Sequence, residues 1–230
     1  MPIGDWRLAI AECAAREVAV KRRRRCGMQS NWQSAIGNRQ LYAGGEMAET
    51  HDRLLHHETA APEVFRLRNG RDIVIRPIRP DDAPRLSEHF SRLSTKSQRM
   101  RFFAPMKRLQ SAFAGRLANV DFVERAAFVA VYPGEETLRG VGRYALESDG
   151  RLEVAFVIDD DMHGLGLGTE LLYHLAALAR ANGYEHLTAQ VLEENEEMLA
   201  VFRGSGFPYR ARTDGSVVHV EMEIGSDASI

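Results

Sequence analysis

Residues 157–172 read Val157-Ile158-Asp159-Asp160-Asp161-Met162-His163-Gly164-Leu165-Gly166-Leu167-Gly168-Thr169-Glu170-Leu171-Leu172. The apolar start predicts the end of a β-strand, and the leucines around and after the glycines predict an amphipathic helix. Between them, three alternating glycines leave backbone N–H groups uncovered and allow positive φ angles. Because these N–H groups lie where a helix begins, unpaired donors and the positive end of the helix dipole face one point. The segment therefore predicts an anion site, for which a phosphate is the usual occupant.

Other glycine patterns fit this loop less well. A nucleotide P-loop has a lysine and then Ser or Thr after its last glycine, whereas Gly168 is followed by Thr169 and Glu170. The dinucleotide fingerprint has its third glycine where Thr169 stands, and it opens a βαβ unit, whereas this loop lies late in the chain. A glycine-rich turn that binds no ligand remains the simplest alternative.

A fourth pattern, polar-x-x-Gly-x-Gly between an apolar strand and a helix, fits residues 163–168. It resembles the acyl-CoA pyrophosphate loop of the GCN5-related N-acetyltransferases (GNAT), where Gln or Arg usually stands at the position of His163. Residues 91–103 (SRLSTKSQRMRFF) resemble the second-helix region of the bacterial Pat-type protein-lysine acetyltransferases, "R-L-S-x-x-S-x-x-x-R-F-F". The segment is expected to be a helix that ends in an aromatic anchor. Because the family fold places this helical pair over the acceptor cleft, a role in substrate choice is the alternative interpretation. The resemblance covers roughly residues 64–225.

The composition fits a protein with one sizeable core, or one domain and a tail. The chain has 230 residues, of which 44% are hydrophobic, and its net charge of −2 gives no whole-chain case for nucleic-acid binding. Cys13 and Cys26 indicate neither a disulfide framework nor a metal site. No apolar run is as long as a membrane span, and no signal-peptide pattern is present. We therefore expect a cytoplasmic protein.

The chain divides into three predicted parts. Residues 1–62 lack strong periodicity and are expected to hold little stable structure. Their basic run, residues 21–25, is interpreted as a solvated segment or as a contact for nucleic acid or anionic lipid, and an upstream start-site error would also explain the whole extension. Residues 63–225 are the predicted GNAT acetyltransferase domain, and residues 226–230 are a tail.

The expected fold class is α/β (α+β), with a mixed, mostly antiparallel twisted sheet and helices on both faces. Asn69-Gly70, Asp149-Gly150 and Asp214-Gly215 are hairpin signals. Asp81 or Asp82 is expected to cap a helix that buries Leu86, Phe90 and Leu93. The remaining expected elements are strands at 127–132, 138–146, 152–158, 187–192 and 217–224, and helices at 166–181, ended by Gly183, and at 195–204.

Glu153 is the predicted general base. Transfer of an acetyl group to an amine requires removal of a proton, because a lysine amine has a pKa of about 10.4 and arrives charged. In the Pat-type enzymes that the sequence resembles, a catalytic glutamate occupies this strand at this distance before the loop. Strand alternation places Glu153 on one face with Ala155 and Val157. The alternative is a glutamate that merely faces solvent.

The resemblance also implies the residues that bind acetyl-CoA, the expected cosubstrate. The pantetheine arm would pair like an extra strand with Phe156, Val157 and Ile158, where a bulge would free an N–H for the thioester carbonyl. His163 would donate to phosphate, and the loop would supply its backbone. The loop residues are Gly164, Leu165, Gly166, Leu167, Gly168 and Thr169.

Three further positions are open to more than one interpretation. Asn195 either faces the cofactor, as in many relatives, or only caps a helix. Phe202 stands where many relatives carry a tyrosine general acid, so the thiolate is expected to leave without one, its thiol having a pKa of about 8.5. The carboxylates of residues 159–161 form a solvated turn or attract a cationic acceptor. His163 has no second metal ligand at useful spacing, and no metal site is expected.

The leading hypothesis is an acetyl-CoA-dependent N-acetyltransferase that acts on protein lysine side chains. A small-molecule amine as acceptor is the second hypothesis, and a non-catalytic acyl-CoA-binding regulatory module is the third. Larger Pat-type members carry acyl-CoA-synthetase-like or cyclic-nucleotide-binding regions, and neither pattern is present in this sequence. The oligomeric state and the identity of the acceptor are not encoded in any pattern found.

Overall fold

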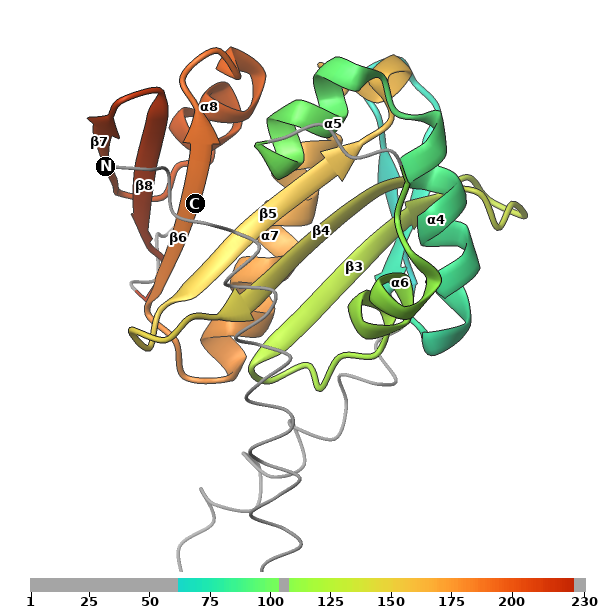
Figure 1. Cartoon of the computed structure of the whole chain (residues 1–230), viewed down its shortest axis with the longest axis horizontal. Coiled ribbons are helices and arrows are strands. Elements are labelled where there is room, and N and C mark those ends of the chain that lie inside the picture. The colour runs from blue at the N-terminus through green and yellow to red at the C-terminus, as the bar shows by residue number, and fades with distance from the viewer. Residues whose placement is uncertain (1–61, 104–107, 226–230) are drawn as a thin grey trace, which may run out of the picture. The chain divides into compact units, whose positions relative to one another are not determined.

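The computed structural model describes residues 62–103 and 108–225 (Figure 1). These residues belong to the second of two compact units into which the chain divides, residues 48–230. Residues 1–61 of the predicted extension, which include the basic run, lie outside the described residues. The predicted tail at 226–230 also lies outside them.

The core of this unit is an eight-stranded sheet with the spatial order β1-β2-β3-β4-β5-β6-β8-β7. Every neighbouring pair is antiparallel except β5 and β6. This arrangement confirms the predicted mixed, mostly antiparallel sheet. The strands are β1 (Glu63–Arg66), β2 (Asp72–Pro77), β3 (Arg125–Val131), β4 (Leu138–Leu146), β5 (Leu152–Ile158), β6 (His186–Leu192), β7 (Tyr209–Asp214) and β8 (Val217–Glu223).

Helices cover both faces of the sheet, as predicted, with α4, α5 and α6 on the near face in Figure 1 and α7 on the far face. Helix α8 packs beside α7, where the Tyr173 hydroxyl donates to the Ser205 carbonyl at 3.0 Å. The helices are α4 (Ala83–Arg92), α5 (Thr95–Phe102), α6 (Ser111–Ala118), α7 (Leu167–Ala181) and α8 (Glu196–Arg203), with short 3-10 turns η2 (Pro80–Asp82) and η3 (Asp160–Met162).

Helix α7 forms because its leucines recur at helical spacing and become fully buried against the sheet, including Leu171 and Leu175. It approaches β4 closely at Gly142, which has no side chain. A Cβ at that position would lie 3.1 Å from the Leu171 Cβ. The helix ends at Ala181, and Gly183, the residue after the C-cap Asn182, has a φ of +83°. The Gly183 N–H donates to Arg180 and the Tyr184 N–H donates to Ala179, which is the Schellman arrangement.

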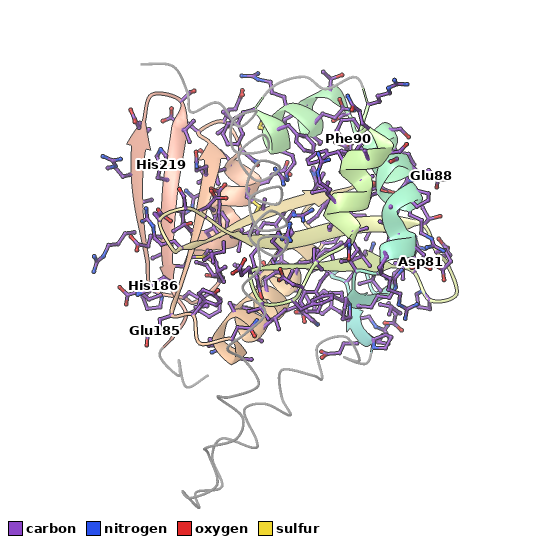
Figure 2. All side chains as sticks on the ribbon, turned by 60° about the horizontal axis from the view of Figure 1, so that its bottom comes forward. Asp81, Glu88, Phe90, Glu185, His186 and His219 are labelled. Carbon is purple, nitrogen blue, oxygen red and sulfur yellow. The ribbon has the colours of Figure 1, made fainter. Side chains whose placement is uncertain are left out.

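The near-face helices are held by aromatic contacts. Phe90 of α4 points inward, whereas Glu88 lies on the outer side of that helix (Figure 2). The rings of Phe90 and Phe102 meet edge to face at 5.4 Å, so the helix within residues 91–103 ends in an aromatic anchor, as predicted. Helix α6 had no counterpart among the predicted elements, because it is short and carries Gly115 in its interior.

Asp82 has a different role from the expected helix cap. It stands at the N-cap position of α4, but its carboxylate makes no capping hydrogen bond to that helix. Instead, it accepts hydrogen bonds of 2.7 and 2.8 Å from the guanidinium of Arg76 and one of 2.8 Å from the Arg79 N–H. Both Arg76 and Asp82 are buried, so this pair replaces the cap as the link between β2 and the helix that follows.

Candidate active site

The sheet opens between β5 and β6. Their parallel pairing consists of Leu152 with Leu187 and Glu153 with Thr188, and it ends there. From Val154 onward β5 runs free of β6, while its pairing with β4 continues without a register shift as far as Ile158. The opening therefore results from lost pairing with β6 and not from a bulge in the β4–β5 ladder.

The free edge of β5 presents alternate backbone groups to this opening. The Leu152 carbonyl accepts a 3.2 Å hydrogen bond from Thr188 Oγ1, which identifies the side that faces β6. Because alternate residues direct their N–H and C=O groups to the same side, Phe156 and Ile158 also face the opening. Val157 directs its backbone toward Val141 of β4 instead. Of the three predicted positions, two thus offer backbone hydrogen bonds to a ligand.

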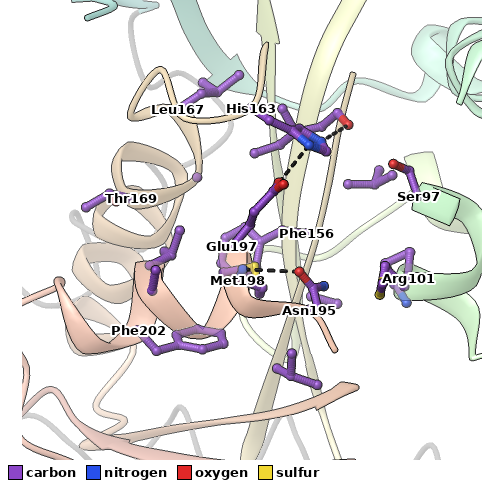
Figure 3. Close-up of a pocket in the computed structure, with 18 of the residues that line it drawn as sticks. Ser97, Arg101, Phe156, His163, Leu167, Thr169, Asn195, Glu197, Met198 and Phe202 are labelled. Atoms are coloured by element: carbon purple, nitrogen blue, oxygen red, sulfur yellow. Dashed lines mark hydrogen bonds and ion pairs between the residues drawn. The ribbon is translucent and has the colours of Figure 1, made fainter. Parts of the chain in front are cut away.

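A cavity of about 820 Å³ follows this opening, between α5 on one side and α7 and α8 on the other (Figure 3). A volume of this size suits a large cofactor or a drug-sized ligand. The predicted site residues that line it are Glu153, Phe156, Val157, Ile158, His163, Gly164, Gly166, Leu167, Gly168, Thr169 and Asn195. Leu165 does not line it, because its side chain packs against the core and its carbonyl accepts from the Arg68 N–H at 3.1 Å.

The glycine loop exposes a row of unpaired donors at one end of the cavity. Within the described part of the chain, no backbone N–H of residues 164–169 donates a hydrogen bond, and the first helical bond runs from Glu170 to the Gly166 carbonyl at 3.2 Å. Gly164 and Gly166 have φ angles of +72° and +91°, which L side chains rarely adopt. Gly168 allows α7 to pack closely against α8, because a Cβ at this position would lie 3.3 Å from Val201. This geometry fits an anion of the size of a diphosphate.

The side chains of His163 and Arg68 both contact this loop. His163 Nδ1 lies 2.7 Å from the Glu197 carboxylate, and its Nε2 lies 3.2 Å from the Ile158 carbonyl (Figure 3). Arg68, in the β1–β2 turn, donates to the Gly164 carbonyl at 3.3 Å and also lines the cavity. Neither Arg68 nor Glu197 was identified from the sequence as a site residue, because both reach the loop through contacts distant in sequence.

Glu153 stands where β5 and β6 part, at the opposite end of the β5 edge from the loop. Its carboxylate accepts a 3.2 Å hydrogen bond from Gln190 Nε2 of β6. Burial and the negative charge of Glu147 raise the pKa of Glu153, while Arg101 and the Gln190 hydrogen bond oppose the shift. A partly dehydrated carboxylate with a raised pKa is suited to accept a proton near neutral pH.

Asn195 caps a helix, which is one of the two roles that the sequence left open, and it also lies in the cavity wall. Its Oδ1 accepts from the Met198 N–H at 3.2 Å and so caps α8, while the residue also lines the cavity (Figure 3). Its Nδ2 has no hydrogen-bond partner among the described residues and remains available to a ligand. Phe202 is buried and meets Phe156 edge to face at 6.2 Å, so it supplies packing and no proton.

Two of the three carboxylates before the loop, Asp160 and Asp161, are exposed, as expected for a solvated turn, but all three also contact protein partners. Asp159 is buried, with His89 Nε2 at 2.9 Å and Arg139 at 3.0 Å. Asp160 accepts from the Ser94 N–H at 2.9 Å and from both serine hydroxyls at the start of α5. Asp161 pairs with Arg139. These contacts bind the strand-to-loop turn to α4, α5 and β4, and they direct Asp159 and Asp161 to protein partners.

The described residues contain neither a metal-binding group nor a helix that could cross a membrane. No group of three or more His, Cys, Asp or Glu side chains in residues 62–103 and 108–225 is arranged to hold a metal ion. Within the same ranges, no helix has the length and hydrophobicity that crossing a membrane requires.

Comparison with known proteins identifies the family. The family model described as "Acetyltransferase (GNAT) domain" matches residues 72–208, which is more than half of the chain. The chain belongs to the GNAT acetyltransferase family. This membership confirms the predicted fold and enzyme class, and it makes acetyl-CoA the cosubstrate of this GNAT domain. The loop and the open strand edge described above are the parts of the domain that fit such a molecule.

Two curated relatives share this domain. A Pseudomonas aeruginosa protein named Acetyltransferase PA5475 is 34% identical over 161 residues, which cover 68% of this chain and 87% of the relative. The Acetyltransferase Pat of Mycolicibacterium smegmatis is 26% identical over 165 residues, or 71% of this chain and 49% of that protein. The alignment thus spans about half the length of the Mycolicibacterium relative.

Solved structures agree with this assignment. The GNAT domain of S. lividans PAT is 33% identical, has a TM-score of 0.65, and aligns over 70% of this chain and 96% of its own. A putative acetyltransferase from Salmonella typhimurium, solved with its cofactor acetyl-CoA, shares the fold at 14% identity and a TM-score of 0.54, covering 68% of this chain and 96% of the other.

Proposed function

We propose that this chain transfers the acetyl group of acetyl-CoA to lysine side chains of proteins, with Glu153 as the general base. The observation that carries the proposal is the placement of Glu153 at one end of the free β5 edge and of the bare N–H groups of the glycine loop at the other. The resemblance of residues 91–103 to the Pat-type enzymes, and the likeness to the S. lividans PAT domain, support lysine as the acceptor. A cytoplasmic location is proposed from the sequence pattern alone.

The residues of the site divide the work of the reaction. The loop N–H groups hold the diphosphate, and His163 joins them when one ring nitrogen exchanges its contact with Glu197 or with the Ile158 carbonyl for the phosphate. The backbones of Phe156 and Ile158 align the pantetheine arm along β5. Asn195 offers its Nδ2 donor to the same arm. Acetyl-CoA supplies the activated acetyl group. Glu153 then takes a proton from the incoming ammonium, directly or through a water, so that the neutral amine attacks the thioester carbon. The tetrahedral adduct loses a second proton from its nitrogen to solvent or to the departing sulfur as the C–S bond breaks, which leaves the amide and CoA.

The leaving thiolate needs no tyrosine in this site. Phe202 occupies the position of the usual acid, and the Tyr173 hydroxyl, which also belongs to the cavity wall, is engaged with the Ser205 carbonyl. A thiol with a pKa of about 8.5 leaves as a thiolate at modest cost near neutral pH. The proton that Glu153 removes can then return to solvent through the open cavity.

Thiol release from acetyl-CoA tests this proposal, with lysine peptides and small amines as separate acceptor panels. We expect acetylation of peptides and a loss of about 10²–10⁴-fold in turnover for Glu153→Gln with acetyl-CoA binding retained. Glu88→Gln, on the outer side of α4, is the matched control and should keep full activity. Acetylation of small amines alone would replace the proposed acceptor, and acetyl-CoA binding without transfer to any acceptor would indicate a regulatory module.

A further inference from the structure

Arg101 is a cationic residue of the cavity wall that has no role in the reaction proposed above. It stands in the last turn of α5, on the wall that faces Asn195 and Phe202 (Figure 3). Its guanidinium lies 4.9 Å from the ring of Phe102. Within residues 62–103 and 108–225, it makes no hydrogen bond and no ion pair of 4.0 Å or less.

Arg68, the other arginine in the cavity lining, donates to the Gly164 carbonyl, and two arginines outside the lining also have partners. Arg99, two residues earlier on α5, pairs with Glu194 at 2.7 Å, and Arg139 pairs with Asp159 at 3.0 Å. Arg101 instead interacts with Glu153 only at long range, without a contact between the two side chains. Burial lowers the pKa of its guanidinium, and the negative charge of Glu153 opposes that shift. A partly dehydrated cation without a contacting anion carries a free-energy cost that a bound anion would remove.

We propose that the acceptor carries a carboxylate close to the amine that is acetylated, and that Arg101 binds this carboxylate while Glu153 receives the ammonium. The inference rests on the proposed function and names its substrate class, a protein lysine with Asp or Glu among its neighbouring residues. One cavity wall then holds a cation and an anion that are more than 4.0 Å apart, and an acceptor with the opposite pair of charges satisfies both. The planar guanidinium suits a bidentate contact with a carboxylate.

Matched peptides test this assignment. Each pair contains one lysine and differs by Glu against Gln at a single flanking position, and kcat/KM is measured by thiol release. For at least one position we expect the Glu peptide to be preferred about tenfold or more, because a charge-assisted hydrogen bond is stronger than a neutral one. Arg101→Gln should reduce this preference to near one, and Arg101→Glu should reverse it toward peptides with Arg at that position. Acetyl-CoA affinity should stay unchanged in both variants.

The control and a second measurement separate this inference from the proposed function. Arg116→Gln, on the exposed side of α6, should keep the wild-type preference. Calorimetry with acetyl-lysine product peptides and the CoA-bound enzyme reports the same preference without turnover. If no peptide is acetylated but Glu-containing products bind more tightly than Gln-containing ones, the acceptor reaction fails and the Arg101 site stands. Equal values for Glu and Gln peptides in both measurements overturn the Arg101 site.

Discussion

Nδ1 of His163 lies 2.7 Å from a carboxylate oxygen of Glu197, so the first residue of the glycine loop is tied to the first turn of α8. The Glu197 side chain is 62% exposed, and its negative charge stands beside the proposed diphosphate site. A carboxylate in this position competes with the anion that the loop N–H groups would bind, because both draw on the same local positive potential.

Removing this charge should tighten binding of acetyl-CoA. For Glu197→Gln we expect an affinity about two- to fivefold higher at low salt, since an exposed charge pair contributes only modestly. The gain should shrink as ionic strength rises, because salt screens the repulsion. Isothermal titration calorimetry at two salt concentrations measures both effects, with Glu193→Gln as an exposed control. Weaker binding by Glu197→Gln would show that the carboxylate supports the loop.

The rate should depend on pH through Glu153. This base works when ionised, so kcat/KM should rise with pH as Glu153 loses its proton. Burial and Glu147 raise its pKa, and Asp149 adds to that shift, so the acidic limb should lie above the ordinary glutamate value of about 4.3. Gln190→Ala removes a hydrogen bond to the ionised form and should move the limb to higher pH. A limb that persists in Glu153→Gln would assign it to another group.

Two glycine substitutions should have opposite effects on stability. Gly166→Ala forces a side chain into a φ of +91° and should lower the free energy of unfolding by about 1–2 kcal/mol, with weaker acetyl-CoA binding. Gly115 lies inside α6 with open space at its Cβ position, so Gly115→Ala should raise the free energy of unfolding by about 0.5–1 kcal/mol. Urea unfolding of both variants checks the pair, and equal signs would contradict the backbone argument.

The buried Arg76–Asp82 pair should dominate acid sensitivity in the first half of the domain. Burial alone would raise the pKa of Asp82, but the hydrogen bonds from Arg76 and the Arg79 N–H hold it below the usual value. Its contribution is therefore complete above the unfolded pKa of about 3.9 and disappears as pH falls through the lower folded value. Asp82→Asn should cost about 3–5 kcal/mol at neutral pH, because Arg76 would remain buried without its partner.

The neighbouring Asp81 provides the control for this substitution. Its carboxylate is 70% exposed and lies 3.7 Å from Arg85, so Asp81→Asn should cost less than about 1 kcal/mol. Urea unfolding at neutral pH and at several pH values below the unfolded pKa of about 3.9 measures both variants. If Asp81→Asn and Asp82→Asn are equally destabilised, burial of the pair does not govern its contribution.

Much of the fold could be predicted because its local signals agree with one another. Asn69-Gly70, Asp149-Gly150 and Asp214-Gly215 lie in the turns between β1 and β2, β4 and β5, and β7 and β8. The leucines of α7 recur at helical spacing and are buried on one side. Local patterns did not reveal α6, which has only eight residues. They also did not reveal the role of the buried Asp82, because its partner Arg76 lies on the preceding strand.

The candidate site could be predicted only along one strand and one loop. Glu153, the β5 edge and the glycines are consecutive in sequence, so their order along the chain also gives their order in space. Arg68 contacts Gly164 across 96 residues, and Arg101, on a separate helix, joins the same cavity wall as Glu153. Such contacts depend on how the β1–β2 turn and α5 pack against the rest of the domain. No periodicity in the sequence predicts this packing. The anchors of residues 159–161 were missed for the same reason.

The short contact between β5 and β6 leaves an unpaired edge in the interior of the sheet. Edges at the rim of a sheet can recruit strands from other chains, which leads to aggregation. This edge instead lines a cavity between α5 on one side and α7 and α8 on the other, so an extended ligand in that cavity can complete its hydrogen bonding. Since such a molecule binds the native state and not the unfolded chain, it stabilises the native state by mass action. The resistance of this protein to heat and proteolysis is therefore linked to the supply of its cosubstrate.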